Sequence, residues 1–224
     1  MGKLLLWTTG VAVGVIVLVV LTSHTYRIPS SAMEPTLRCG KPGPGCSGSS
    51  DDRILVPRFL FKSAQRGDLI AFKTPPLARV RCGAGGVFVK RVVGLPGERI
   101  GERSGTVVLN GRRLREPYVE RARRDNQTYA PRVVAAGAYF VLGDNRAQSC
   151  DSRAWGSVVR SALIGEVFMT YWPPNRISFH FVGGAIAAHL ALFEILNDPV
   201  HNNGPVGPAV NPSGLRFAWI DAGG

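Results

Sequence analysis

Short apolar runs separated by turn-forming residues dominate the middle of the chain. The runs "DLIAF" at 68–72, "VFVKRVVG" at 87–94 and "AYFVLGD" at 138–144 are rich in β-forming residues and have the length of strands. The run "TVVLNGRRL" at 106–114 has Asn110-Gly111 at its centre, which predicts a β-hairpin with a type I′ turn. The run "SALIGEVFMTYW" at 161–172 adds a less distinct strand. Many short strands with proline and glycine between them favour an antiparallel β domain over βαβ units.

One long apolar segment departs from this pattern at the N-terminus. Leu4–Leu21 contains no charged residue, and as a helix it would extend about 27 Å, close to the hydrocarbon thickness of a bilayer. The alternative is a cleavable signal peptide, whose apolar region would be shorter and would end in an A-x-A-like site. The sequence "TSHTYRIP" that follows Leu21 has no such site. We therefore expect a transmembrane anchor over residues 1–22, followed by a β domain over 23–175.

Residues 176–224 form a third region with a different composition. The run "AIAAHLALFEIL" at 185–196 is apolar but too short to cross a bilayer by itself. Extending it back to Ser178 gives a sufficient length but includes His180, His189 and Glu194, which disfavours a second span. The remainder is rich in glycine, proline and asparagine and is expected to be a loose tail.

Composition and charge narrow the possible partners. The chain has 224 residues, 45% of them hydrophobic, so it can build a core and is not globally disordered. Its net charge of +12 favours an acidic partner, either nucleic acid or an anionic membrane surface. No zinc finger or aromatic-interleaved RNA motif accompanies the charge, so we expect membrane lipid and no nucleic acid. The arginine cluster is interpreted as a solvated lobe rather than a binding patch; its members are Arg112, Arg113, Arg115, Arg121, Arg123 and Arg124.

The four cysteines indicate disulfide bonding rather than a metal site. Cys39 and Cys46 bracket "GKPGPG", a turn-rich loop that predicts a short disulfide if the domain lies outside the cytoplasm. Cys82 and Cys150 are either free or paired with each other. No C-x-x-C pair exists and no histidine lies near a cysteine in the sequence, so a zinc site is not expected.

Lysine is the candidate catalytic base. The chain has no G-x-S-x-G motif and its histidines stand in no recognisable catalytic context, so a Ser/His/Asp hydrolase is unsupported. The two-residue period of the strand at 87–94 places Phe88, Lys90 and Val92 on one face. Apolar neighbours would lower the lysine pKa, and a value of about 8 requires about 3 kcal/mol of destabilisation of the ammonium. The alternative is a lysine whose stem packs while its charge reaches water.

Four motifs occur in a fixed order and together carry a family resemblance. They are "IPSSAMEPTL" at 28–37, "RGDLIAF" at 66–72, "KRVVGLPGE" at 90–98 and "GDNRAQSCDSRAWG" at 143–156. This sequence, with an N-terminal anchor just before the first motif, closely resembles the bacterial type I signal peptidases from Ile28 to Pro173. The resemblance implies a mainly β fold, with an antiparallel β catalytic core and a smaller β lobe. It also implies a single-pass membrane endopeptidase with an extracytoplasmic catalytic domain, which removes signal peptides from exported preproteins without metal or cofactor.

The resemblance also implies roles for individual residues. Lys90 resembles the general base of the family's Ser/Lys dyad, and Ser149 resembles the hydroxyl that orients this lysine. Ser30 resembles the side-chain donor of the oxyanion hole. The supporting positions are Met33 and Pro35, which shape the turn, and a polar network of Asp144, Asp151 and Arg153. The substrate is expected to bind as an extended chain beside a strand edge, with small residues flanking the cut.

The sequence departs from the family pattern at the nucleophile. The family has serine immediately before the methionine of the first motif, and this chain has Ala32, which cannot form an acyl-enzyme. Three accounts remain open: Ser31 acts in its place, the chain binds signal peptides without cleaving them, or alanine was introduced to trap substrate. Alternation along an extended chain would put Ser30 and Ala32 on one side and Ser31 on the other, which argues against Ser31.

Overall fold

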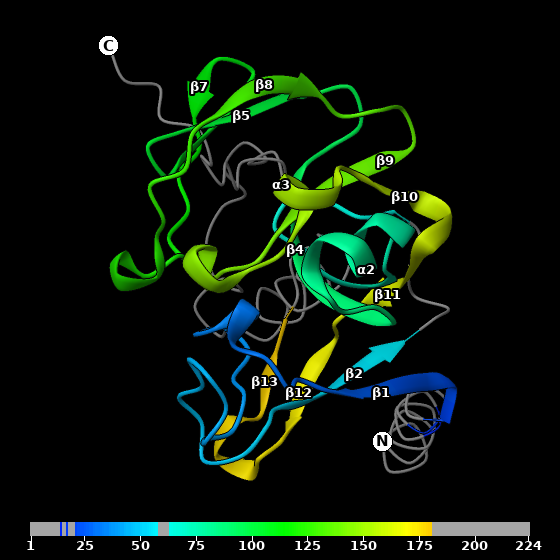
Figure 1. Cartoon of the computed structure of the whole chain (residues 1–224). Coiled ribbons are helices and arrows are strands. Elements are labelled where there is room, and N and C mark those ends of the chain that lie inside the picture. Colours follow the sequence, from blue (N-terminus) through cyan, green and yellow to red (C-terminus); the bar gives the residue numbers. More distant parts are fainter. Residues whose placement is uncertain (1–13, 15–16, 18–20, 58–62, 181–224) are drawn as a thin grey trace, which may run out of the picture.

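The computed structural model describes residues 14, 17, 21–57 and 63–180, and within them the chain forms three antiparallel sheets (Figure 1). The central sheet has five strands in the order β10-β9-β4-β3-β11. Its members are β3 (Leu69–Lys73), β4 (Val87–Gly94), β9 (Ala138–Leu142), β10 (Val158–Val159) and β11 (Leu163–Glu166). The strand β4, which carries Lys90, lies at the middle of this sheet, and its residues from Lys90 to Gly94 are buried.

A second sheet of four strands packs near the N-terminal end of the described chain, in the order β1-β2-β12-β13. Its strands are β1 (Ser23–Arg27), β2 (Arg53–Pro57), β12 (Met169–Trp172) and β13 (Ser178–Phe179). Apolar side chains of β2 and β3 share one core cluster, in which Ile54 and Val56 meet Leu69 and Ala71. This cluster also contains Met33, so the core anchors the turn of the first motif.

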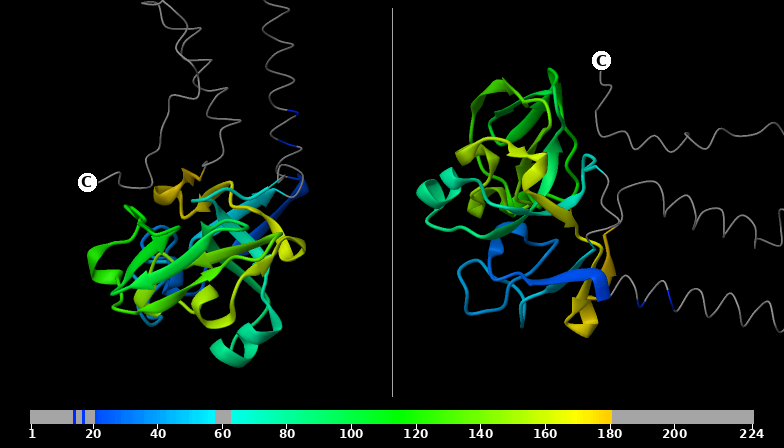
Figure 2. Two further views of the ribbon diagram at one scale, coloured as in Figure 1. Left: turned by 90° about the horizontal axis from the view of Figure 1, so that it is seen from above. Right: turned by 90° about the vertical axis from the view of Figure 1, so that its right-hand side faces the viewer.

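The third sheet forms a separate lobe in the order β7-β6-β5-β8, at the top of Figure 1. Its strands are β5 (Arg99–Arg103), β6 (Thr106–Leu109), β7 (Arg112–Arg113) and β8 (Tyr129–Val133). The lobe is not independent of the central sheet, because Ile100 and Leu109 pack in one cluster with Phe140 and Leu142 of β9. Two views at right angles show the lobe and the second sheet on opposite sides of the central strands (Figure 2).

Helices are short and occupy the connections. They are α2 (Pro76–Cys82), α3 (Ser152–Trp155), η1 (Ser31–Met33), η2 (Arg121–Arg123), η3 (Arg146–Gln148), η4 (Arg160–Ala162) and η5 (Pro174–Arg176). Pro76 opens α2, where its missing N–H is no loss, and Gly83 ends the helix with a φ of 66°. Trp155 of α3 and Ala78 of α2 cover the central sheet at Ile70 and Val92.

The mainly β fold and its best-marked strands confirm the sequence predictions. The predicted strand at 87–94 is β4, and those at 68–72 and 138–144 correspond to β3 and β9 within about two residues. The predicted hairpin is β6–β7, with φ of 51° at Asn110 and 84° at Gly111, as a type I′ turn requires. The second sheet continues beyond the expected boundary at 175, because Ser178 and Phe179 form β13.

Two predictions fall largely outside the described residues. The expected anchor over 1–22 is described only at a few positions near its end, and the apolar run at 185–196 is not described. Among the residues that are described, the structure has no helix both long and apolar enough to cross a bilayer.

The four cysteines form two disulfide bonds. Cys39 is bonded to Cys46, which confirms the prediction for the turn-rich loop. Cys82 at the end of α2 is bonded to Cys150, which settles the open choice between free and paired thiols. The second bond joins α2 to the segment directly after Ser149, so it restrains the region that the fourth motif occupies.

Candidate active site

The first motif forms a tight turn rather than an extended strand. Ser30 is extended, with φ of −133° and ψ of 150°, and its side chain is exposed. Ser31, Ala32 and Met33 then form the 3-10 helix η1, and all three are buried. The expectation that residues 30–32 alternate sides is therefore wrong, because helical φ and ψ replace the two-residue period at this point.

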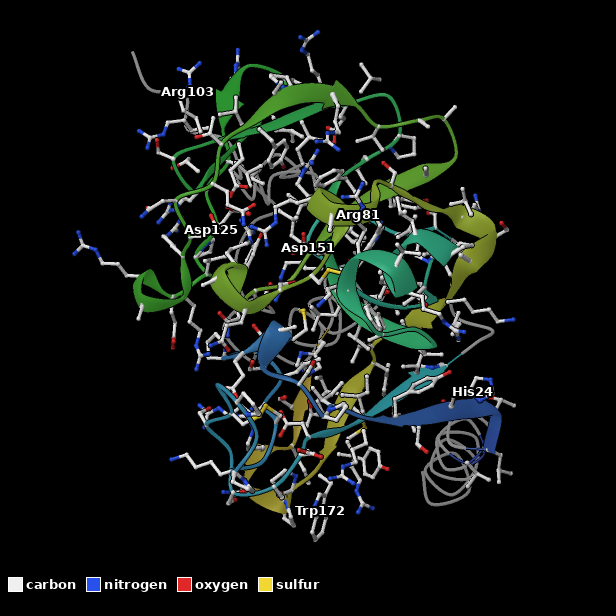
Figure 3. The ribbon with its side chains drawn as sticks, in the orientation of Figure 1. His24, Arg81, Arg103, Asp125, Asp151 and Trp172 are labelled. Atoms are coloured by element: carbon white, nitrogen blue, oxygen red, sulfur yellow. A yellow bond between two sulfur atoms is a disulfide. The ribbon has the colours of Figure 1, made fainter. Side chains whose placement is uncertain are left out.

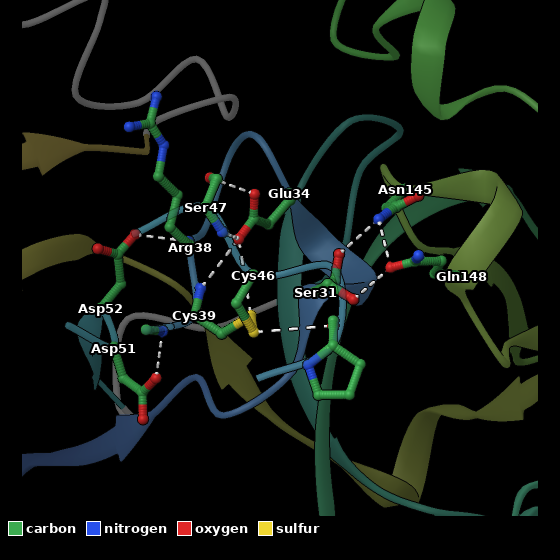
Figure 4. The surroundings of a disulfide bond; sticks show 12 residues. Ser31, Glu34, Arg38, Cys39, Cys46, Ser47, Asp51, Asp52, Asn145 and Gln148 are labelled. Carbon is green, nitrogen blue, oxygen red and sulfur yellow. Dashed lines mark hydrogen bonds between the residues drawn. A yellow bond between two sulfur atoms is a disulfide. The ribbon is translucent and has the colours of Figure 1, made fainter. Parts of the chain in front are cut away.

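The Ser31 hydroxyl is nevertheless engaged in a hydrogen bond with another residue. Its hydroxyl donates to Oε1 of Gln148 at 2.7 Å, and Asn145 Nδ2 donates to the carbonyl oxygen of Ser31 at 3.0 Å (Figure 4). The loop closed by the Cys39–Cys46 disulfide covers the same hydroxyl, because a Cβ on Gly45 would lie 2.9 Å from it. The Ser31 oxygen is thus enclosed between η3 and the disulfide loop.

Glu34 fastens the disulfide loop to the turn. Its carboxylate is fully buried and accepts from the backbone N–H of Ser47 at 2.7 Å and of Cys39 at 3.3 Å (Figure 4). Arg123 Nη2 donates to the same carboxylate at 2.8 Å. Glu34, Cys39 and Cys46 are grouped closely enough to suggest a metal site, but the two sulfurs are bonded to each other and offer no thiolate. This cluster is structural.

Three segments converge at Gly143. A Cβ there would lie 2.2 Å from Ser149 Oγ and 2.4 Å from the Ala32 carbonyl oxygen, so only glycine fits between them. The backbone N–H of Asn145 donates to the same carbonyl of Ala32 at 3.1 Å. The carbonyl oxygen of Ala32 and the Ser149 hydroxyl therefore both lie against Gly143.

Lys90 is buried in the central sheet, within the electrostatic reach of Asp144 and Asp151. The residue is 4% exposed, and its ammonium lies 5.8 Å from the ring centroid of Phe88, in agreement with the predicted shared strand face. Burial lowers its pKa to about 8, against the opposing fields of Asp151 and Asp144. Asp144 directly follows Gly143, and Asp151 accepts from the Gly143 N–H at 3.0 Å. A lysine near this pKa releases its proton at mildly alkaline pH, as a general base must.

Ser149 presents a hydroxyl with an unused hydrogen-bonding capacity. Its Oγ is buried and has no hydrogen-bond partner among the described residues. Buried polar groups are almost always paired, so an orphan hydroxyl needs a functional or structural reason. The Ser149 hydroxyl lies against Gly143, close to the Ala32 carbonyl oxygen. It is therefore available to an amine or a substrate that reaches this point.

A buried ionic network holds these segments in place. Asp151 is fully buried, and Arg153 donates to it through Nε at 2.8 Å and Nη2 at 2.9 Å. This arginine holds the pKa of the Asp151 carboxyl below its ordinary value, although burial acts in the opposite direction. Arg153 also pairs with Asp125 in the segment after η2. Figure 3 labels Asp125 and Asp151, the two carboxylates that this arginine joins. Of the predicted network of Asp144, Asp151 and Arg153, the last two are paired with each other, and their supporting role stays a prediction.

Asp144 organises a second buried pair. Arg91 donates to its two carboxylate oxygens at 2.8 Å and 2.6 Å, and Thr36 Oγ1 donates at 2.5 Å. Arg91 also stacks 4.1 Å from the ring centroid of Tyr118. Thr36 lies three residues after the end of η1, and Arg91 is in β4. The Asp144 carboxylate, which binds both, therefore connects the turn of the first motif to the strand that carries Lys90.

Several residues around the site were missed by the sequence analysis. Arg91, Asn145, Arg146 and Gln148 lie inside the quoted motifs, so their positions could have drawn attention. Glu102 had no such signal: it is 3% exposed, neither carboxylate oxygen has a hydrogen bond, and its nearest cation is Arg153 at 3.8 Å. Burial and the nearby Asp125 raise its pKa to about 7.

Comparison with known proteins agrees with the motifs. The profile of a family described as "Signal peptidase, peptidase S26" matches residues 1–172. "Signal peptidase I" of Leptolyngbya laminosa is 37% identical over 153 residues, which are 67% of this chain and 69% of that protein. "Probable signal peptidase I-2" of Synechocystis is 32% identical over 179 residues, 79% of this chain and 74% of its own. "Signal peptidase I" of Mycobacterium tuberculosis is 33% identical over 207 residues, covering 71% and 68%.

Proposed function

Because the chain belongs to the signal peptidase family, peptidase S26, we propose that its site is built to remove N-terminal signal peptides from exported preproteins. The observation that carries this proposal is Lys90, a buried lysine with a pKa lowered to about 8 beside the turn where the family has its nucleophile. A dyad of serine and lysine needs no histidine, metal or cofactor, since the neutral amine itself accepts the serine proton.

The proposed roles follow the family resemblance. With a serine at position 32, Lys90 accepts the hydroxyl proton as the oxygen attacks the scissile carbonyl, and it returns the proton to the leaving amine. By the family resemblance, Ser149 orients the lysine amine; its buried hydroxyl has no hydrogen-bond partner among the described residues and is free to take this role. Ser30 is exposed and its side chain does not cap η1, so its hydroxyl can donate to the developing oxyanion.

The substrate segment finds an open strand edge next to Lys90. β4 pairs with β9 only from Arg91 onward, whereas it pairs with β3 along Val87–Arg91. Among the described strands, none pairs with Val87–Val89 on the β9 side. An extended peptide can add there by main-chain hydrogen bonds and bring its scissile bond to Lys90.

In the sequence as it stands, Ala32 leaves this machinery without an attacking oxygen. Ser31 is not an equivalent replacement, because its hydroxyl is enclosed and donates to Gln148. We therefore propose that the chain, as given, binds preproteins and does not turn them over, and that a serine at position 32 makes it a peptidase.

The N-terminal anchor and the location of the domain belong to the same proposal. The uncharged run Leu4–Leu21 supports a single membrane span, and the two disulfides support an extracytoplasmic domain in an oxidising compartment. Protease added outside spheroplasts should then digest the β lobe. Complete protection of the lobe would contradict this topology.

The binding proposal is tested with the full-length chain in detergent and a purified preprotein, compared with the same protein lacking its signal peptide. We expect the preprotein to be retained and to keep its size, and the mature protein to pass through. Equal retention of both proteins would contradict the proposed substrate. A product of mature size would show that the chain contains a working nucleophile.

A further inference from the structure

The segment 115–125 of the lobe is fastened to the catalytic core at three points. Glu116 forms an ion pair with Arg146 of η3, and both side chains are buried. Arg123 binds the carboxylate of Glu34, two residues after Ala32. Asp125 binds Arg153, the partner of Asp151. This segment therefore has a fixed position along the border of the active site.

Beside and between these fixed points the segment presents unpaired positive charge. Arg115, Arg121 and Arg124 are exposed and make no ion pair with a described residue. The carboxylates of the same segment are all engaged by other arginines: Glu116 by Arg146, Glu120 by Arg123, and Asp125 by Arg153. No acidic side chain of the segment is left to neutralise its outer face.

This face adjoins the route of a bound substrate. A signal peptide that pairs with the open edge of Val87–Val89 reaches the cut at Lys90, and the chain beyond the cut then continues on the other side of this lysine. The turns η1, η3 and η2, in blue, yellow-green and green below the lobe in Figure 1, contact one another in that order, and Arg123 of η2 binds Glu34 directly after η1. The fixed arginine segment is thus placed to meet the mature part of the substrate.

The charge distribution of a preprotein determines which part of it can bind to the exposed arginines. A signal peptide has a basic N-terminal region, an apolar central region and small residues at the cut, so it offers no acidic groups. Acidic residues close to the cut can only come from the mature side. Exposed arginines bind carboxylates well because the guanidinium presents several donors in a fixed plane.

We propose that Arg115, Arg121 and Arg124 form a binding surface for acidic residues on the mature side of the cleavage site. This inference rests on the proposed function, and it names a substrate preference that the function alone does not require. The surface acts on affinity and on the rate of encounter, and it takes no part in the chemical step.

The chain as given suits the test, because Ala32 lets a peptide bind without being consumed. The probes are peptides that span a signal-peptide cut and continue for ten mature residues, carrying either four Asp or Glu residues or the matching Asn or Gln. We expect the acidic peptide to bind about tenfold more tightly than the neutral peptide at low salt. Each of the three arginines can form one exposed ion pair with the peptide, and such pairs are individually weak. The difference should shrink as added salt screens exposed charges.

Two triple variants separate a local surface from general charge. Arg115→Gln/Arg121→Gln/Arg124→Gln should reduce binding of the acidic peptide to that of the neutral peptide and leave the neutral peptide unaffected. The matched control is Arg103→Gln/Arg112→Gln/Arg113→Gln, which removes three exposed arginines from β5 and β7. Figure 3 labels Arg103 in the upper part of the lobe. It should leave most of the preference in place.

Each remaining outcome overturns the proposal in a distinguishable way. Equal affinity for acidic and neutral peptides, with both bound, removes the substrate preference and leaves the proposed function intact. Equal effects of the two triple variants would mean that net charge, not this surface, acts on the peptide. Failure of both peptides to bind would overturn the proposed function together with the inference.

Discussion

Two regions of the molecule meet at Gly143 and differ in their chemistry. We call residues 30–33 the nucleophile turn, and Lys90 together with residues 143–153 the base side. The base side has a buried lysine of lowered pKa, an unpaired Ser149 hydroxyl and a carboxylate held by Arg153. The turn has the right position, held by Asn145 and by Glu34, and no attacking atom, because residue 32 is alanine. A buried lysine and an orphan hydroxyl are both costly to keep. On the proposed function, both groups are kept because the site is arranged for a hydroxyl at position 32.

The largest effect is expected on the base side. In an Ala32→Ser background, Lys90→Met should lower the cleavage rate by about a thousandfold or more, because the carboxylates near the turn, Glu34 and Asp144, are already paired with arginines. The free energy of unfolding at pH 7 should be unchanged or higher, since a buried ammonium is removed. The matched control is Lys73→Met, which removes an exposed lysine from the neighbouring strand β3. Equal activity of the two variants would show Lys90 to be an ordinary packing residue.

A large loss of stability is expected where the two sides are joined. Asp144→Asn leaves Arg91 buried without its countercharge and removes an acceptor for Thr36. The free energy of unfolding should fall by about 3–5 kcal/mol, as for other broken buried pairs. Glu98→Gln is the control, because it breaks a two-bond pair with Arg66 that is more exposed. Denaturant unfolding of both variants measures the difference, and equal losses would mean that burial is not the cause.

A pH-dependent effect is expected behind the base side, at Glu102. Its pKa is raised to about 7 in the folded protein by burial, Asp125 and Asp151, against the fields of Arg153 and Arg146. The stability that its protonated form contributes is complete below the unfolded pKa of 4.5 and is lost as pH rises through about 7.

Glu102→Gln should therefore raise the free energy of unfolding at pH 8 by about 1–3 kcal/mol and change it little at pH 4. Unfolding curves across this range measure the effect, with the exposed Glu120→Gln as the control. A variant that is destabilised equally at both pH values would show that the carboxylate has a purely steric role.

The smallest effect is expected at the turn itself. Ser31→Ala removes the hydrogen bond to Gln148, worth about 1 kcal/mol at most in a part-buried contact. In the Ala32→Ser background the cleavage rate should stay within about tenfold of its parent. Complete loss of activity with normal folding would identify the Ser31 hydroxyl as a reacting group.

The sequence predicted the strands and the chemistry that lie within continuous motifs. β3, β4 and β9 carry their own apolar runs, and the strand period correctly placed Lys90 beside Phe88 and Val92. It failed at η1, where a 3-10 turn replaces the expected extended chain, because turn geometry depends on the buried partners Gln148 and Glu34. Neither Glu102 nor the pairing of Glu116 with Arg146 could be predicted. Both arise from contacts between the lobe and the core, which no local pattern records.

The central claim, that only one oxygen is missing, is tested most directly by comparing cleavage of a purified preprotein by the chain as given and by Ala32→Ser. We predict that the serine variant releases a product of mature size at a rate higher by orders of magnitude, with a rate that rises as pH passes about 8. An Ala32→Ser variant that folds and binds preprotein but stays inactive would contradict the claim. So would brisk cleavage by the original chain that Ser31→Ala abolishes, because the nucleophile would then lie one residue earlier.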